Sequence, residues 1–446
     1  MQLKRSTLVA YAGPAMPLAA IGLPMIVYLP PYYAGDLGLD LGLVGLIFFL
    51  VRAIDLPLDP LLGHLMDGTR SRFGRYRPWL LAGAASTMLG AYLVFMAPPG
   101  ISGLQAFAQL MFLYVGYSMM MVAQLAWGAT LSDDYHQRSR VFGWREATGI
   151  FGMVLVLTLP AIAGRLSGEE GAAPGIHAMG WFIILLAPLA ALLMAARVPE
   201  RQRSLIRTEV KWADVKTLAR NPLMRRLLIV DVLAGVAPGI TGAMFLFYFE
   251  HRLGFSARDA STLLLVYFVA GFGAAPLWMK LARAIGKHRA AAVAGVVYCT
   301  THGALALLPA ADLTDAMIGM ALAGLPYAAA PFLLRAMLAD VADSDRLETG
   351  LDRNGLLQAV LSTTLKIAHA APVAVIYPVL GLIGFDPKPG AANTEDSILG
   401  MTLLFVLAPI VLMASAAAII ARWPHDEAAH ARLQAALAER AARPAE

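Results

Sequence analysis

The stretch Arg52-Ala-Ile-Asp55-Leu-Pro-Leu-Asp59-Pro60 carries three charged side chains inside a long apolar run of the sequence. A charged side chain at the centre of a bilayer costs about 2.5 kcal/mol or more, and charged residues at that depth usually mark ion or substrate pathways. On an α-helix, positions 52, 55 and 59 fall on one face, because residues three and seven apart return close to the same azimuth. The stretch therefore predicts a membrane-spanning helix with one charged face.

The whole chain has the composition of a polytopic membrane protein. Of its 446 residues, 59% are hydrophobic and only 15% are charged, and the mean hydropathy is +0.64. Soluble domains average about 45–50% apolar and about 25% charged residues. The basic residues behind the net charge of +5 are scattered between apolar runs, which does not suggest a nucleic-acid partner. No cleavable signal peptide is expected, because the apolar stretch after Lys4 and Arg5 is too long for one.

About twelve apolar runs are near the roughly 20 residues that a spanning helix needs. We therefore expect an all-α membrane protein with about twelve transmembrane helices. The runs lie near Leu8–Tyr33, Leu41–Met66, Trp79–Met96, Leu104–Leu131, Val141–Ala163, His177–Ala196, Leu223–Glu250, Ala260–Leu281, Ala290–Leu308, Ala316–Leu338, Gly355–Ile383 and Ile398–Ala421.

Lys and Arg are concentrated in every second connection between these runs. Because cytoplasmic loops carry the excess of Lys and Arg, this pattern predicts that both termini are cytoplasmic. The basic residues are Arg70, Arg72, Arg75 and Arg77 after the second run, Arg138 and Arg140 after the fourth, seven residues between Arg197 and Arg220 after the sixth, and Lys280, Arg283, Lys287 and Arg289 after the eighth.

The chain also looks duplicated. Asp59-Pro60 near the end of the second run has a counterpart in Ala275-Pro276 near the end of the eighth, and each is followed by a Gly-containing basic loop. Two six-helix halves are the layout of the large two-lobed transporter folds, which bind their solute near the bilayer midplane. We expect an N-terminal half (1–196), a basic linker (197–220), a C-terminal half (221–423) and a cytoplasmic tail (424–446).

Asp55 and Asp59 are the candidate ion-binding residues. At about 1.5 Å per residue they lie roughly 18 Å and 12 Å inward from Asp67 at the cytoplasmic end of the helix. Two carboxylates one turn apart repel each other when both are ionised, and a monovalent cation, a shared proton or a neighbouring Arg relieves that repulsion. The alternative is a buried Arg52–Asp55 pair that only fixes helix packing.

These residues resemble the signature of a known family. Asp55-x-x-x-Asp59-Pro60-x-x-Gly63-x-x-x-Asp67-x-Thr69-x-x-x-x-Gly74-Arg75-x-Arg77-Pro78 is similar to the first block of the glycoside–pentoside–hexuronide:cation symporters, the melibiose-permease relatives within the major facilitator superfamily. Later blocks are similar to Leu131–Glu146 and to Ala339–Lys366. The resemblance covers nearly the whole chain. It implies a major facilitator fold of two pseudo-symmetric six-helix halves, alternating access, and uptake of a solute with Na⁺, Li⁺ or H⁺.

The resemblance also implies site residues. Asp55 and Asp59 match the family's cation-binding carboxylates, and Ser118 falls where a hydroxyl joins the cation site. Arg145 and Lys366 match basic residues of the sugar and cation cavities. The residue pattern adds Arg52, Tyr28, Tyr117, Gln124 and Trp127 as candidate substrate-lining residues. A cytoplasmic latch of ion pairs is expected from Asp67, Arg75, Arg77, Asp133, Arg138 and Asp340.

Some positions depart from the melibiose-permease pattern. Leu58 replaces an amide side chain near the cation, which removes a possible oxygen ligand and favours a proton over sodium. The first helix lacks an acid between Gly13 and Ala20, and the fourth carries the run Met119-Met120-Met121. A sugar site needs several polar groups, so the Met-rich wall suggests a more apolar or amphiphilic solute. Adaptable core packing explains the Met run equally well.

The leading hypothesis is an H⁺- or Na⁺-coupled secondary transporter, not an enzyme, that moves a small organic solute: a sugar or glycoside, or a more apolar, amphiphilic or anionic compound. We expect a monomer in the cell (inner or plasma) membrane that needs no cofactor and holds no metal beyond a possible Na⁺ at the two acids. One alternative is an intramembrane prenyltransferase-like enzyme, in which Asp-x-x-x-Asp holds Mg²⁺ and a diphosphate. Another is a non-transporting receptor with a transporter fold.

Overall fold

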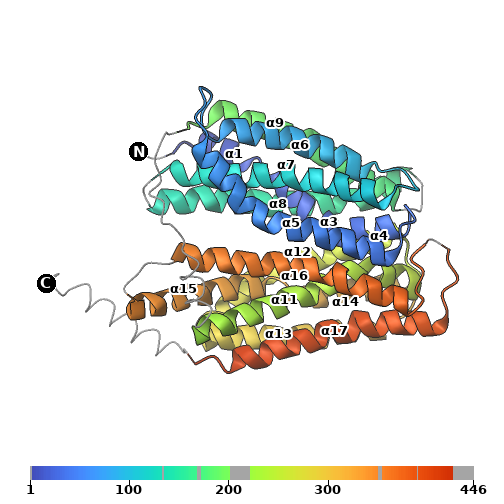
Figure 1. Ribbon diagram of the computed structural model, residues 1–446. Helices are drawn as coiled ribbons and strands as arrows, with labels where there is room; N and C mark the ends of the chain where they lie inside the picture. Colours follow the sequence, from blue (N-terminus) through green and yellow to red (C-terminus); the bar gives the residue numbers. More distant parts are fainter. Residues whose placement is uncertain are drawn as a thin grey trace. The chain divides into compact units, whose positions relative to one another are not determined.

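The structure, a computed structural model, describes residues 3–132, 135–167, 172–200, 221–349, 354–388 and 390–424. The structure also does not describe a few side chains within the helices, including those of Asp67 and Arg138. Asp133 and the tail after residue 424 are outside the described residues. The described part contains helices, turns and loops but no β-strand (Figure 1).

The helices follow the order predicted from the apolar runs. They are α1 (Arg5–Ala12), α2 (Ala15–Gly22), α3 (Pro24–Val27), α4 (Leu29–Ala34), α5 (Leu41–Gly68), α6 (Arg77–Phe95), α7 (Gly103–Thr130), α8 (Tyr135–Ser167), α9 (Ala173–Arg197), α11 (Pro222–Phe247), the π-helix η1 (Tyr248–Arg252), α12 (Ala257–Ile285), α13 (Lys287–Ala304), the 3₁₀ turn η2 (Leu305–Leu307), α14 (Leu313–Gly324), α15 (Ala329–Thr349), α16 (Asn354–Leu382) and α17 (Glu395–Ala421).

Among the described residues, eleven helical segments are long and apolar enough to cross a membrane, and Lys366–Leu382 within α16 is a shorter apolar segment. In a bilayer every backbone polar group needs an internal partner, so a chain of this composition folds into helices. The predicted all-α membrane fold with about twelve transmembrane helices is confirmed.

The first apolar run is divided into four short helices rather than one. Gly13-Pro14 separates α1 from α2, and Pro24 begins α3. Pro30 lies near the start of α4. Proline lacks the N–H of the helical ladder and clashes with the preceding turn, which explains why the run bends while its cap residues keep helical dihedral angles.

The described chain forms two compact units. The first contains residues 1–206, 242–265 and 373–401, and the second contains residues 207–241, 266–372 and 402–446. These units do not follow the expected boundaries at residues 196 and 221, because two C-terminal segments belong to the first unit. The division into two six-helix halves and a linker remains a prediction.

Close helix packing builds the core of the first unit. A side-chain carbon at Gly116 of α7 would lie 2.6 Å from the backbone nitrogen of Thr87 in α6, so these helices approach almost to backbone contact. Met120, Ala123 and Trp127 on α7 are fully buried beside that crossing. Figure 1 shows α6 and α7 running side by side, and α9 also packs on α6.

The second unit has its own apolar core around α11, α15 and α16. Met224, Leu227, Leu338 and Leu357 are fully buried there. Polar side chains inside this unit have partners: the Tyr298 and Thr241 hydroxyls lie 3.1 Å apart, and a ring nitrogen of His302 lies 2.8 Å from the Phe405 carbonyl oxygen. This unit is therefore packed like a protein interior.

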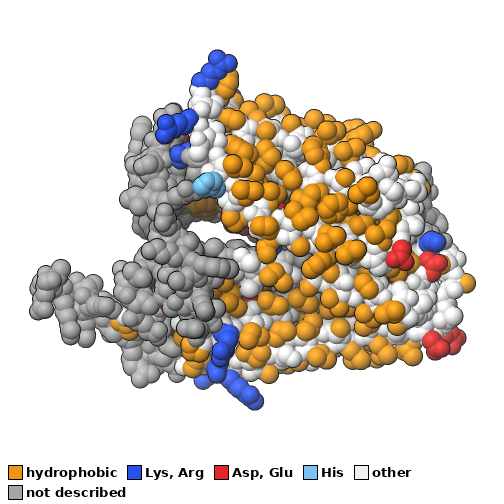
Figure 2. Space-filling model, in the orientation of Figure 1, with side chains coloured by type: hydrophobic (Ala, Val, Ile, Leu, Met, Phe, Trp, Pro, Cys, Tyr) orange, Lys and Arg blue, Asp and Glu red, His pale blue; other side chains and the backbone are white. Residues whose placement is uncertain are grey.

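Figure 2 shows hydrophobic side chains over the middle of the helices. Many large apolar residues are more than half exposed, among them Leu185 at 66% and Leu189 at 63% on α9. In water such a surface is costly, but lipid covers it without penalty.

Candidate functional site

Asp55 lies at the centre of a buried polar cluster on α5. Its side chain is 0% exposed, and its Oδ1 accepts a hydrogen bond from the Ser118 hydroxyl of α7 at 2.7 Å. Arg52, one turn earlier, places a guanidinium nitrogen 3.8 Å from Asp55 Oδ2. A fully buried carboxylate needs a compensating charge and hydrogen bonds. The cluster supplies both, and it brings together three residues that the sequence singled out.

Asp59 lies one turn further along the same helix and is half-buried. Two prolines, Pro57 and Pro60, are inside α5 beside it. Because proline has no N–H, the carbonyl groups four residues earlier, at Ala53 and Leu56, lose their usual helical donor. This part of α5 therefore combines two carboxylates with backbone oxygens that the helix itself does not satisfy, and oxygen is the ligand type that Na⁺ shares with other hard cations.

A narrow pocket opens beside Arg52. Its walls are mostly apolar and aromatic, formed by Ile21, Gly22, Met25, Leu113, Tyr114 and Tyr117, and the guanidinium carbon of Arg52 lies 4.6 Å from the centre of the Tyr114 ring. The free volume of about 10 Å³ holds no more than one water molecule. Tyr114 was not predicted from the sequence, although its position one turn before Ser118 on α7 places it on the same helix face.

Gln124 and Trp127, which were predicted to line the substrate site, are instead buried in the core of the first unit. Both are 0% exposed. Gln124 donates to the Tyr11 carbonyl at 2.9 Å, and the Trp127 indole donates to the Pro199 carbonyl at 3.2 Å. Met120 is also fully buried. In this structure these residues pack and brace α7, which supports the packing interpretation of the Met run, and their role in substrate binding remains a prediction.

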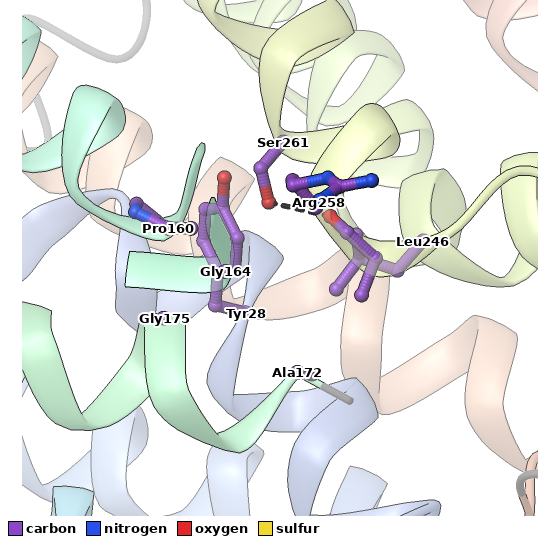
Figure 3. A pocket seen from close by; sticks show the side chains of 9 residues that line it. Tyr28, Pro160, Gly164, Ala172, Gly175, Leu246, Arg258 and Ser261 are labelled. Carbon is purple, nitrogen blue, oxygen red and sulfur yellow. Dashed lines mark hydrogen bonds between the residues drawn. The ribbon is translucent and has the colours of Figure 1, made fainter. Parts of the chain in front are cut away.

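Tyr28 lines a second small pocket, where the first helical run approaches α12 (Figure 3). It is 2% exposed, and its hydroxyl points toward Ser261, which donates to the Ala257 carbonyl at 2.8 Å. Gly164, Gly175 and Arg258 complete the walls. Buried tyrosines usually find a partner for the hydroxyl. Among the described residues the Tyr28 oxygen meets no partner in good hydrogen-bonding geometry, although Ser261 is close enough to act on it. Tyr28 therefore adds a polar hydroxyl to the lining of this small pocket.

The two predicted basic residues occupy different units. Arg145 on α8 has a mostly buried side chain, 17% exposed, which pairs with the neighbouring Glu146. Lys366 on α16 is half-buried in the second unit. In that unit the Thr364 hydroxyl donates to Asp231 at 2.7 Å, so Asp231 has an immediate partner. The structure does not bring Arg145 and Lys366 together within one unit, and their roles remain predictions.

The predicted latch residues make contacts inside their own units. Arg77 donates to the Val198 carbonyl at 3.1 Å and lies over the Trp127 ring. The backbone N–H groups of Arg75 and Tyr76 donate to Glu200, the residue that follows α9. This role of Glu200 was not predicted from the sequence. A signal was available, because Glu200 is the first acid after a long helix and precedes a basic linker.

Gly74 makes the Glu200 contact possible. It adopts φ +112°, which disfavours any other residue, and a side-chain carbon there would overlap a carboxylate oxygen of Glu200. In the second unit Asp340 pairs with Lys287, whose ammonium lies 2.7 Å and 2.8 Å from the two carboxylate oxygens. Asp67, Asp133 and Arg138 are predicted latch residues whose side chains lie outside the described part.

Comparison with known proteins now decides the family. The profile of the MFS/sugar transport protein family matches residues 10–427. The chain belongs to that family. The match spans nearly the whole chain, so the family assignment covers both compact units of the fold.

Individual proteins that resemble this chain are distant from it in sequence. The glucuronide carrier protein homolog of Escherichia coli (strain K12) is 22% identical over 404 residues, covering 89% of this chain and 87% of that protein. The sodium-dependent lysophosphatidylcholine symporter 1-A of Danio rerio is 22% identical over 429 residues, covering 85% and 78%. The crystal structure of the nucleoside transporter NupG has a TM-score of 0.69 at 14% identity, covering 94% of this chain and all of that one, and it supports the major facilitator fold.

Proposed function

We propose that this protein is a cation-coupled symporter in which Asp55, Asp59 and Ser118 bind one H⁺ or Na⁺ for each transport cycle. The observation that carries the proposal is the Ser118–Asp55 hydrogen bond of 2.7 Å at a fully buried carboxylate. A residue that only fixed packing would not need a second acid one turn away. Two acids within one turn favour a state in which a positive charge is bound between them.

The proposed coupling follows from electrostatics. Without a cation, the ionised carboxylates repel each other and hold Arg52 as their counter-ion. When a cation binds, the negative charge is neutralised, and Arg52 is released from part of its interaction with Asp55. Because Arg52 also lines the aromatic pocket, cation binding changes the charge that a solute meets there. This coupling is reciprocal, so the solute also strengthens cation binding.

The lining of that pocket supports a solute class. Aromatic rings and one guanidinium recognise a compound with an apolar or aromatic body and an anionic or hydrogen-bond-accepting group. Such a compound fits the relatives named for a glucuronide and for lysophosphatidylcholine. We therefore propose an amphiphilic or anionic organic solute rather than a neutral sugar, moved by alternating access with both termini in the cytoplasm.

The test uses purified protein and a panel containing a glucuronide, a nucleoside and a lysophosphatidylcholine. Thermal stability is measured for each compound at several pH values and Na⁺ concentrations, because a ligand that binds only the folded state raises stability as its concentration exceeds its Kd. The proposal predicts that one compound stabilises the chain more when the coupling cation is present. Equal stabilisation with and without Na⁺, and at all pH values, would contradict coupling.

A further inference from the structure

A cavity in the first unit lies away from Asp55, near the ends of α4 and η1. It has a volume of about 390 Å³, which is large enough for several water molecules. Its polar lining residues are Tyr32, Asp36, Glu250, His251 and Ser256, and its apolar ones include Phe247 and Phe255. All of them belong to the first unit.

Two carboxylates from separate parts of the chain share this cavity. Asp36 follows α4, whereas Glu250 lies in the π-helical turn that ends α11, and the charge of Asp36 acts on Glu250. One carboxylate oxygen of Glu250 is fully buried and meets no hydrogen-bond partner among the described residues. A buried, unsatisfied carboxylate oxygen is costly, and a proton or a cation that neutralises the Glu250 carboxylate reduces that cost.

Among the described residues, no basic side chain forms an ion pair with Asp36 or Glu250. The Arg258 side chain interacts with Asp259 at 3.9 Å. Arg252 is exposed and acts on Tyr248, and the cavity-lining His251 packs its ring 5.1 Å from that of Phe385 and is influenced by Asp386. Lys388 lies nearby on the same loop as Asp386 and is exposed. The remaining titratable group on the Asp36 side is Tyr32.

Burial also affects Asp36, which lies outside the spanning segments. Desolvation raises the pKa of the Asp36 carboxyl above its ordinary value. A carboxyl whose pKa is raised in the folded state is most favourable when protonated. Its contribution to stability is present at low pH and is lost as the pH rises through that raised pKa.

We propose that this cavity is a second cation-binding site, in which Asp36 and Glu250 hold one monovalent cation or proton and thereby keep this end of the unit closed. The ligand chemistry is a single positive charge between two carboxylates. The walls of the cavity meet closely: a side-chain carbon at Gly35 would lie 2.8 Å from the Pro387 carbonyl oxygen. When both carboxylates are ionised and empty, their repulsion acts to separate these walls.

The site is separate from the one in the proposed function. The topology of the proposed function places the cavity on the non-cytoplasmic side, so that compartment would supply the cation. Tyr28 and Ser261 line a small pocket that shares Ala172, Leu246 and Ala257 with the cavity. Polar groups therefore continue inward from the second cation site.

Cysteine labelling tests the proposal directly. In full-length Cys299→Ala protein in nanodiscs, Ala257→Cys places a thiol in the cavity wall, and Ala392→Cys places one on an exposed loop of the same unit. The alkylation rate at position 257, divided by that at 392 under the same conditions, removes the pH dependence of thiol chemistry. We expect this ratio to rise about threefold or more from low to high pH in the absence of Na⁺.

Na⁺ distinguishes the two sources of charge. If added Na⁺ lowers the ratio at high pH, the ligand is an alkali ion; if only the pH changes it, the ligand is a proton. Glu250→Gln should make the ratio independent of both, whereas Glu395→Gln, which removes an exposed acid of the same unit, should leave the dependence intact. A ratio unchanged by pH and Na⁺, or one that changes equally in Glu250→Gln, would overturn the proposal.

Two further measurements distinguish the cavity site from the Asp55–Asp59 site. Asp59→Asn should retain the cation dependence of labelling, and loss of that dependence would show that the cavity only follows the Asp55–Asp59 site. The thermal stability of the unaltered chain should fall as the pH rises. The thermal stability of Glu250→Gln, made without the labelling cysteines, should fall less. An equal fall in Glu250→Gln and the unaltered chain would contradict the proposal, while failure of solute uptake would bear on the proposed function alone.

Discussion

At the scale of single residues, the account depends on the hydroxyl of Ser118 and the carboxylate of Asp55. A hydrogen bond to a charged group contributes about 1.5–3 kcal/mol, more than a neutral one. The position of Ser118 came from the resemblance to a family, since nothing in the spacing of residues 55 and 118 shows that they meet. The apolar run around Asp55 predicted a buried carboxylate at that position, but it did not predict that Ser118 is its hydrogen-bond partner.

Ser118→Ala should weaken cation binding by roughly tenfold while the protein still folds. The buried Asp55 carboxylate loses the Ser118 hydroxyl as a donor. The proposed cation site also loses one of its three oxygen-bearing side chains, so the cation binds less tightly. Cation-dependent thermal stabilisation measures the change. Ser415→Ala is the matched control, because the Ser415 hydroxyl is exposed and bonds only to its own helix at Val411. Equal cation affinity in both variants would contradict the role given to Ser118.

Gly74→Ala should destabilise the protein by more than about 1 kcal/mol, the usual cost of a non-glycine residue at such dihedral angles. The additional cost comes from the clash with Glu200. Gly100→Ala is the control, since Gly100 has φ +77° but open space around it. Thermal unfolding should show a larger loss for Gly74→Ala, and Glu200→Ala should remove the excess. The same loss at both glycines would mean that the Glu200 contact is unimportant.

At the scale of helices, sequence pattern predicted most of what the structure contains. The apolar runs gave the spanning segments because a bilayer requires each of them to be helical. Interruptions were harder: Pro14 and Pro24 indicate where the first run bends, but the number of short helices depends on packing around it. The π-helical turn at Tyr248–Arg252, which places Glu250 in its cavity, had no recognisable signal.

The crossing of α6 and α7 makes a prediction at this scale. Gly116→Val should abolish recovery of monodisperse protein, because the added atoms meet the backbone of Ser86 and Thr87, which cannot move aside. Gly143→Ala on α8 is the control: its added carbon meets no atom within 4 Å, and alanine favours a helix by up to about 1 kcal/mol over glycine. Size-exclusion chromatography distinguishes the two. A monodisperse Gly116→Val protein would contradict the described contact.

At the scale of the whole molecule, the family and the fold were predictable from the sequence, whereas most long-range contacts were not. The Asp55-x-x-x-Asp59-Pro60 block, read with its basic loop, is specific enough to identify the family. The meeting of Asp36 with Glu250 is different, because residues more than 200 positions apart share a cavity only through tertiary packing. Hydropathy and motif patterns carry no information on that kind of contact.

The central claim is that transport is driven by a cation held at Asp55 and Asp59. The most direct test is accumulation of the stabilising panel compound in proteoliposomes under an imposed pH or Na⁺ gradient. The account predicts gradient-driven accumulation by the unaltered chain and by Glu395→Gln, and a loss of about tenfold or more in Asp59→Asn. Undiminished gradient-driven accumulation by Asp59→Asn, in protein that is equally folded and inserted, would contradict it.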